Sequence, residues 1–266
     1  MQATQQELDA VRRSLGLDRP LYVQFARWIR RALVGDFGTS VFSGRPTFEE
    51  IFPRLVASLQ LTVAGTVVGA SAGLALGVIS GARPYSWIDK GSTLIAVLSI
   101  SVPSFWLGVI LIYVFAVILG WFPSSGRGGI ENFVLPGLCV ATWSFGLLVR
   151  LTRSSVLEVM GDDYIRTARA KGNSERRVLF SHALKNALLP VVTVLGVQFG
   201  LVLTSAVGIE VVFAWPGLGR LIADSILARD YPTVQAAVIA VAVVFVLTNL
   251  VVDLALGYFD PRIRYH

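Results

Sequence analysis

The stretch LTVAGTVVGASAGLALGVISGA, residues 61–82, decides the class of fold. It carries no charge and is long enough to cross a bilayer as an α-helix, which takes about 20 apolar residues. Within it glycine returns at every fourth position, at Gly65, Gly69, Gly73, Gly77 and Gly81. Small residues at this spacing let helix backbones approach closely. The stretch therefore predicts a membrane helix packed tightly inside its own bundle, with a seam between two copies of the chain as the alternative.

The rest of the chain has the same character. Its 266 residues are 54% hydrophobic and 15% charged, whereas a soluble domain has about 25% charged residues. Five runs without charge could each supply a span: residues 55–82, 91–126, 132–149, 186–209 and 231–252. We therefore predict an all-α integral membrane protein with five spans, at residues 57–82, 93–119, 132–152, 188–210 and 232–256. The third span is the weakest, because Pro136 interrupts it.

The basic residues predict the orientation of these spans. The segment between the third and fourth runs holds eight of them: Arg150, Arg153, Arg166, Arg169, Lys171, Arg176, Arg177 and Lys185. Cytoplasmic loops carry an excess of Lys and Arg. We therefore expect this segment in the cytoplasm, together with the C-terminal tail that holds Arg262 and Arg264.

In this topology residues 1–54 form an extracytoplasmic segment ahead of the membrane domain, residues 55–266. The segment carries eight arginines and no apolar signal sequence. A span upstream of Met1 is therefore expected to carry it across the membrane, which would give a six-span protein with both termini inside. Amphipathic helix patterns occupy residues 5–15 and 21–38. The second pattern suits a helix on the membrane surface or one packed on its own domain.

Few polar residues interrupt the spans. Pro103, in ISVPSFW, is expected to kink the second span. Ser101 and Ser104 beside it either satisfy freed backbone carbonyl groups or line a hinge or a pathway. Gln198 and Thr204 are candidates for the pathway or for interhelical hydrogen bonds.

The sequence offers no chemistry that could energise transport. Its acids near the spans, Glu210 and Asp253, lie at span ends where water is expected to reach them, unlike the buried acids of ion-coupled carriers. HExxH and GxxxxGK[ST] motifs are absent, and Cys139 is the one cysteine. We therefore expect no enzymatic activity, cofactor, metal site or nucleic-acid partner on this chain. Transport against a gradient would need energy from another chain.

One basic segment carries helix signals: DDYIRTARAKGNSERRVLFSHALKNALLP, residues 162–190. Asp162 can cap a first helix, Gly172 can end it in the left-handed conformation, and Asn173 or Ser174 can cap a second. The two helices would span residues 163–171 and 175–188. Residues 162–188, called the knuckle from here on, are therefore predicted to form a compact helix–turn–helix unit.

The knuckle has two interpretations. The small side chains of Thr167 and Ala168 leave space that a partner protein could fill, which favours a docking element. The alternative is a solvated basic loop held by anionic lipid. Two capped helices exceed what is needed to set topology, and this favours docking.

The segment YIRTARAKGNSERRVLFSHALKNALLP resembles the cytoplasmic "EAA" loop of type I ABC importer permeases, in the first permease subunit of the dipeptide, oligopeptide and nickel branch. Other stretches agree: LGLDRPLYVQF, GDFGTS, SVPSFWLG, WFPSSG, EVVFAWPGLGRL and YFDPRIRY. Arg166 and Thr167 stand where the general pattern has Glu and Ala, whereas Ala168 and Gly172 match it. The family also has a span ahead of its extracytoplasmic segment.

The resemblance implies a heteromeric importer in the bacterial inner membrane. Its parts would be a paralogous second permease, two cytoplasmic ATPases that bind ATP and Mg, and an extracytoplasmic binding protein. The loop at 158–187 would couple to an ATPase, through Arg166, Thr167, Ala168, Arg169, Ala170, Lys171 and Gly172. Trp215, Pro216 and Gly217 would face the binding protein or, alternatively, form a re-entrant cap on the bundle.

The resemblance also bounds the substrate. Di- and oligopeptides are expected, with nickel or a metal chelate and glutathione as alternatives, because the binding protein largely sets selectivity. A stand-alone channel or secondary carrier is the hypothesis from another class. The structured basic segment and the lack of buried charge in the spans argue against it.

Overall fold

The computed structural model describes residues 18–259, without the side chains of Val197, Phe199, Asp253 and residues 255–259. Its regular elements are all helical, apart from an isolated bridge between Thr39 and Pro46. Four helices in this part of the chain are long and apolar enough to cross a membrane, and a bent helix pair adds a fifth if it counts as one span. The all-α membrane fold is therefore confirmed. The helix predicted at 5–15 and the basic tail lie outside the described residues.

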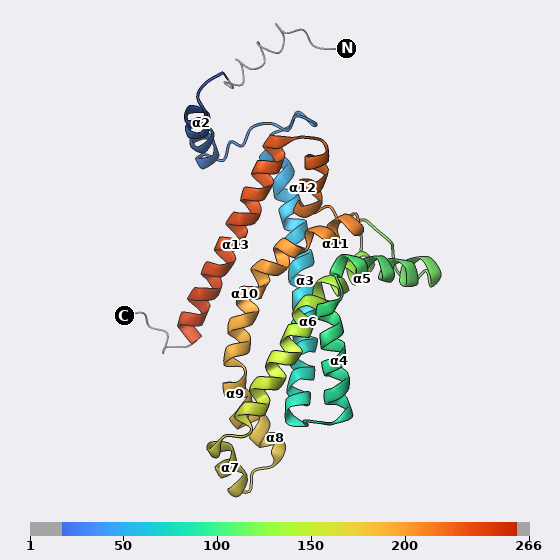
Figure 1. Cartoon of the computed structure of the whole chain (residues 1–266), viewed down its shortest axis with the longest axis vertical. Helices are drawn as coiled ribbons and strands as arrows, with labels where there is room; N and C mark the ends of the chain where they lie inside the picture. The colour runs from blue at the N-terminus through green and yellow to red at the C-terminus, as the bar shows by residue number, and fades with distance from the viewer. Residues whose placement is uncertain (1–17, 260–266) are drawn as a thin grey trace.

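Helices α3 (Thr47–Ala82) and α6 (Glu131–Val159) lie side by side at the centre of the bundle (Figure 1). The glycines of α3 face α6: a Cβ at Gly77 would lie 2.6 Å from Thr152 Cβ, and one at Gly81 would lie 2.7 Å from Val156 Cβ. The small-residue seam thus lies inside the chain, as predicted.

Both central helices extend beyond the predicted spans. Helix α3 begins at Thr47, so the expected boundary between residues 54 and 55 falls within it. Helix α6 continues through Pro136, and the run expected to be weakest is the most central one. A proline inside a helix removes one backbone hydrogen bond and crowds the carbonyl of residue i−4, and packing against α3 outweighs that cost.

The second predicted span is broken rather than kinked. Helix α4 (Trp87–Ser101) ends at Val102, and α5 (Ser104–Leu111) and the π-helix η1 (Ile112–Ile118) leave it at 104°. Val102 is extended, with φ −89° and ψ 124°, because the ring of the following proline disfavours helical backbone there. Figure 1 shows α5 turning aside at the top of α4.

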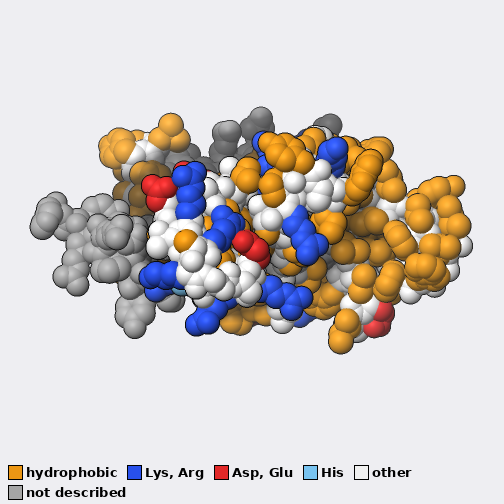
Figure 2. Space-filling view, turned by 90° about the horizontal axis from the view of Figure 1, so that it is seen from below, with side chains coloured by type: hydrophobic (Ala, Val, Ile, Leu, Met, Phe, Trp, Pro, Cys, Tyr) orange, Lys and Arg blue, Asp and Glu red, His pale blue; other side chains and the backbone are white. Residues whose placement is uncertain are grey.

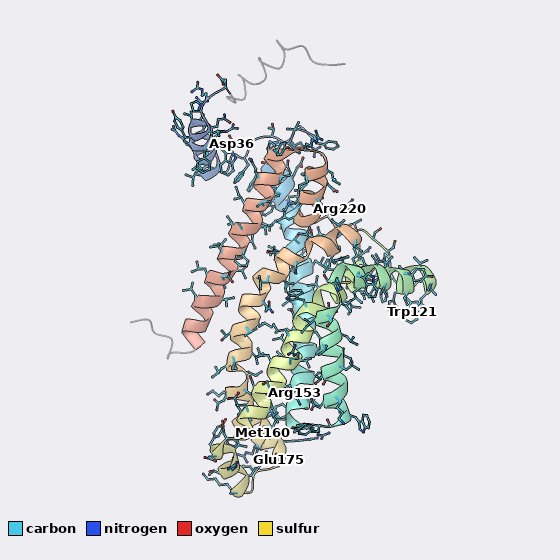
Figure 3. All side chains as sticks on the ribbon, viewed as in Figure 1. Asp36, Trp121, Arg153, Met160, Glu175 and Arg220 are labelled. Carbon is cyan, nitrogen blue, oxygen red and sulfur yellow. The ribbon has the colours of Figure 1, made fainter. Side chains whose placement is uncertain are left out.

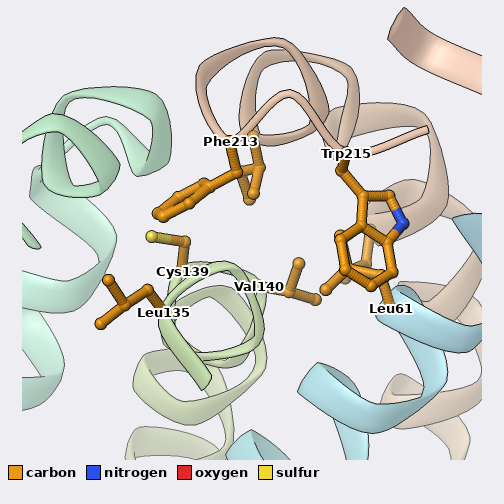
Figure 4. Packing of buried hydrophobic residues seen from close by; sticks show 8 residues of the cluster. Leu61, Leu135, Cys139, Val140, Phe213 and Trp215 are labelled. Atoms are coloured by element: carbon orange, nitrogen blue, oxygen red, sulfur yellow. The ribbon is translucent and has the colours of Figure 1, made fainter. Parts of the chain in front are cut away.

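The C-terminal part of the bundle consists of α10 (Leu189–Ser205), α11 (Val207–Val212), α12 (Leu218–Leu227) and α13 (Tyr231–Phe259). Glycine again permits close packing, since a Cβ at Gly200 of α10 would lie 2.7 Å from the ring of Phe245 on α13. A buried apolar cluster joins α3, α6, α10 and α11 around Leu61, Cys139 and Phe213 (Figure 4). This cluster lies toward the end of the bundle opposite the knuckle, and a smaller one around Ala70, Leu148 and Val191 lies nearer the knuckle.

The segment ahead of the membrane domain, described from residue 18, contains helix α2 (Leu21–Leu33), none of whose residues is buried. It therefore does not pack on its own domain as one alternative supposed. The loop after it is anchored by buried Asp230, which accepts hydrogen bonds from Ser40 and Thr233. Burial raises the pKa of Asp230, but hydrogen bonds from Ser40, Thr233 and Val41 outweigh it and hold that pKa below its usual range.

Candidate functional site: the knuckle and the cap

The knuckle links the end of α6 to the start of α10. Its first helix, α7 (Asp163–Ala170), ends one residue before the predicted limit, with Lys171 as C-cap. Gly172 follows with φ +80°, the left-handed conformation that glycine adopts without strain. The predicted glycine stop is confirmed.

The second half of the knuckle is not the single helix expected. It is divided into α8 (Glu175–Arg177), the π-helix η2 (Val178–Ala183) and α9 (Leu184–Ala187). Asp162 and Ser174 occupy the predicted N-cap positions, but neither side chain makes a cap hydrogen bond. Asn173 instead donates to the carbonyl of Ala168 at 2.9 Å, which ties the turn to α7.

The knuckle has its own small core. Ile165, Ala168, Val178 and Ala183 are buried together, with Met160 packed against them. The expectation that Ala168 leaves space for a partner is therefore wrong: its small side chain lets α7 lie close to η2. Thr167 remains exposed, and its hydroxyl donates to the carbonyl of Asp163 at 3.0 Å.

Charged side chains cover the outside of this core. Arg166, Ala170 and Lys171 are exposed, while Arg169 donates to the carboxylate of Glu175 at 2.8 Å. The Arg169 guanidinium holds the pKa of Glu175 below its usual range, mainly through this hydrogen bond. Figure 2 views the molecule from this end and shows Lys and Arg side chains gathered there. The knuckle is a folded, basic surface rather than a solvated loop.

Residues 207–227, called the cap from here on, close the opposite end of the bundle. Trp215 is fully buried, at 0% exposure, and its indole N–H donates to the carbonyl of Ala57 at 3.0 Å. Gly217 is also buried, and it lies so close to the carboxylate of Glu210 that a Cβ there would overlap it. Trp215 and Gly217 therefore do not face a binding protein, and Pro216 is half-buried. The re-entrant cap is the alternative that the geometry supports.

The expectation that water reaches Glu210 is also wrong, because this residue is 1% exposed. Its carboxylate accepts hydrogen bonds from the Ser58 hydroxyl and from the backbone N–H groups of Gly219, at 2.7 Å, and Arg220, at 3.2 Å. Those N–H groups belong to the first turn of α12, where the helix dipole favours negative charge. The Glu210 carboxylate therefore links the start of α12 to Ser58 of α3. In the sequence, Glu210 followed by WPGLG at residues 215–219 was the signal that could have indicated this buried turn.

Replacing Glu210 with alanine should destabilise the membrane domain by about 2 kcal/mol, because it leaves buried donors without an acceptor. Glutamine keeps one acceptor oxygen, so Glu210→Gln should cost clearly less. The temperature at which buried Cys139 becomes reactive to a thiol dye measures unfolding. Exposed Glu158, changed to alanine, is the matched control. Equal unfolding temperatures for Glu210→Ala and Glu158→Ala would contradict this role.

The pathway candidates fall into two groups. Pro103 and Ser101 are exposed at the bend between α4 and α5, and Ser104 is half-buried there. On α10, the Thr204 hydroxyl donates to the carbonyl of Gly200 at 3.2 Å, and Gln198 has a buried side-chain oxygen with no hydrogen-bond partner among the described residues. Between residues 18 and 259 no cluster of His, Cys, Asp and Glu could hold a metal ion.

The described chain is thus a bundle of apolar helices with a buried cap at one end and a folded basic knuckle at the other. Residues 73–265 match the family described as "Binding-protein-dependent transport system inner membrane component". The chain belongs to this family and is a permease of an ABC importer.

Relatives and solved structures agree with this assignment. The glutathione transport system permease protein GsiC of Salmonella paratyphi A is 44% identical over 264 residues, which cover 99% of this chain and 86% of the relative. The GsiC protein of Escherichia coli K12 is 45% identical over the same shares. These relatives are permease proteins, not ATPases.

Two solved transporters share the fold. A methionine ABC transporter, MetNI, in an inward-facing conformation superposes with a TM-score of 0.67 at 18% identity, over 80% of this chain and 97% of that one. An amino acid ABC transporter solved with histidines has a TM-score of 0.60 at 17% identity, over 81% and 95%.

Proposed function

We propose that this chain forms the translocation pathway of an ATP-driven importer together with a paralogous second permease. Two cytoplasmic ATPases would bind ATP and Mg and supply the energy, and an extracytoplasmic binding protein would deliver the substrate. The chain itself would hydrolyse nothing, and its C-terminus would lie in the cytoplasm. Its transported substrate would be a short peptide. The GsiC relatives support glutathione, which is itself a tripeptide, as the first compound to test.

The folded knuckle is the observation that carries this proposal. It has its own buried core, a left-handed glycine at its turn and an exposed basic surface on α7. A loop that only set topology would need charges but no core. Because a rigid unit moves as one body, a displacement of α7 by an ATPase would be passed to the ends of α6 and α10. Arg166, Thr167, Ala170 and Lys171 would face the ATPase, whereas Ala168, Arg169 and Gly172 would hold the knuckle in shape.

The first experiment is purification from membranes in mild detergent, with the chain tagged. We expect an ATPase and a second permease to co-purify. In proteoliposomes the complex should then take up labelled glutathione or a labelled dipeptide, and only with ATP inside and the binding protein outside. Recovery of the chain without any ATPase would contradict the importer assignment. Uptake of nickel chelates in place of peptides would contradict the substrate proposal alone.

A further inference from the structure

The cytoplasmic half of the bundle contains an ion pair between two membrane helices. Arg153 of α6 donates from Nε and Nη2 to the two carboxylate oxygens of Asp89 on α4, the second bond measuring 2.9 Å. Of the five ion pairs among residues 18–259, this is the one that joins separate long helices. The two-pronged geometry fixes the relative orientation of the two side chains as well as their distance.

Asp89 is fixed from its own side too. It is 3% exposed, and its carboxylate also accepts the backbone N–H of Tyr85 at 2.8 Å. Its own N–H is held by the hydroxyl of Ser86, the N-cap of α4, at 3.2 Å. The start of α4 is therefore a rigid point, and the Arg153 guanidinium attaches α6 to that point.

Arg153 lies close to the knuckle. Helix α6 ends at Val159, within two turns of Arg153, and Arg169 of the knuckle donates to the carbonyl of Met160 at 3.4 Å. Figure 3 places Arg153, Met160 and Glu175 in succession toward the knuckle end of the molecule. A displacement of the knuckle would therefore move Arg153, the residue through which α6 forms its ion pair with α4.

The far end of α4 leads to the cap. After the bend at Pro103, α5 packs on the cap through Gly108, where a Cβ would lie 2.9 Å from the ring of Phe213. Contacts thus run from the knuckle through α6, the ion pair, α4 and α5 to the cap. Elsewhere α4 packs on α6 by close approach without charge: a Cβ at Gly146 would lie 2.7 Å from the carbonyl oxygen of Ala96 and 2.8 Å from Ile100.

We infer that the Asp89–Arg153 pair is a coupling clamp, which makes α4 follow α6 when the knuckle moves and so transmits the ATPase stroke to the extracytoplasmic cap. Both residues are positioning residues: neither touches ATP or the substrate. The inference rests on the proposed function of the knuckle. A van der Waals contact between α4 and α6 can slide, whereas a bidentate charge pair resists sliding because an unpaired, partly buried charge is costly.

The test uses the whole complex in nanodiscs, with ATP hydrolysis measured with and without the substrate-loaded binding protein. Asp89→Asn and Arg153→Gln should each lower the ratio of stimulated to basal hydrolysis by about threefold or more, the range reported for residues along coupling networks. Exposed Arg150 on the same helix, changed to glutamine, is the matched charge control and should keep the wild-type ratio. Arg153→Lys keeps the charge but loses the fork, and should fall between wild type and Arg153→Gln.

The double variant Asp89→Asn/Arg153→Gln distinguishes joint action of the two residues in coupling from separate structural roles of each. If the two residues act as one clamp, the double variant loses no more coupling than either single variant. Independent, multiplying losses would overturn the inference, and so would wild-type ratios in both single variants or an equal loss in the Arg150 control. A wild-type complex without any ATP-driven uptake would overturn the proposed function and the clamp with it.

Discussion

Gly69→Ala should unfold the membrane domain more readily by about 3 kcal/mol, the upper part of the range for overpacked cores. A Cβ at Gly69 would overlap the carbonyl oxygen of Ala141 and lie 2.9 Å from the carbonyl carbon. The obstacle is backbone, which cannot rotate away as a flexible side chain would. In an open helix the same substitution would instead be favourable by about 1 kcal/mol. A loss of stability in Gly69→Ala would therefore indicate that α3 lies in close contact with α6, whereas a gain would indicate an open helix face.

The measurement is the temperature at which Cys139 reacts with a thiol dye, in purified permease or with cysteine-free partners. Cys139 is the one cysteine of the chain and lies in the core next to the seam. Gly91→Ala and Gly137→Ala are the matched controls, because a Cβ at either position meets nothing within 4 Å. They should leave the unfolding temperature unchanged or raise it. A Gly69→Ala protein as stable as these controls would contradict the close contact of α3 with α6.

Gly172→Pro should abolish substrate-stimulated ATP hydrolysis while the chain still inserts into the membrane. Proline locks φ near −65° and has no N–H, whereas Gly172 has φ +80° and donates to the carbonyl of Arg169 at 2.9 Å. The substitution must therefore unwind the end of α7. Ala168→Trp should have the same effect, because Ala168 is buried in the core of the knuckle.

Gly172→Asn is the control, because asparagine tolerates the left-handed conformation better than other residues. It should retain most of the stimulation. Alanine at Arg176 or Arg177 should also matter less if those arginines serve topology or lipid contact. Normal stimulation in both Gly172→Pro and Ala168→Trp would remove the coupling role of the knuckle. A complex that no longer assembles with Gly172→Pro, but does so with Gly172→Asn, would assign the knuckle to docking.

The long helices and their seam could be predicted from sequence because both depend on local, repeated patterns. Gly65 to Gly81 recur on one helix face, and that face must meet another backbone. The glycine stop at Gly172 could also be predicted, since a left-handed turn after a helix needs glycine. These signals require no knowledge of which helix is the neighbour.

The burial of single residues could not be predicted, because it depends on distant parts of the chain. Trp215 and Glu210 follow an apolar run in a segment with turn signals, which suggested exposure at a loop. Their partners, Ala57 and Ser58, lie on α3, more than one hundred and fifty positions earlier in the chain. Likewise nothing local to Asp89 indicates that Arg153 will lie opposite it. The pairing appears only once α4 and α6 are placed side by side.

The sharpness of the bend at Pro103 is a third case. Proline predicts a break in a helix but not its angle. The 104° turn is set by what α5 finds to pack against, namely Phe213 at Gly108 and the other apolar residues of the cap. Local sequence therefore marks the position of the bend, and tertiary packing sets its angle.

The contact between the knuckle and an ATPase is most directly tested by site-specific photo-crosslinking in intact membranes. A photoreactive residue at exposed Thr167 of α7 is compared with one at Val41, which is 76% exposed on the extracytoplasmic segment. We predict a crosslinked adduct with the ATPase subunit from position 167 and none from position 41. Assembled, transport-competent complexes that give no ATPase adduct from position 167, or from neighbouring Arg166, would contradict the central claim that energy enters the permease through the knuckle.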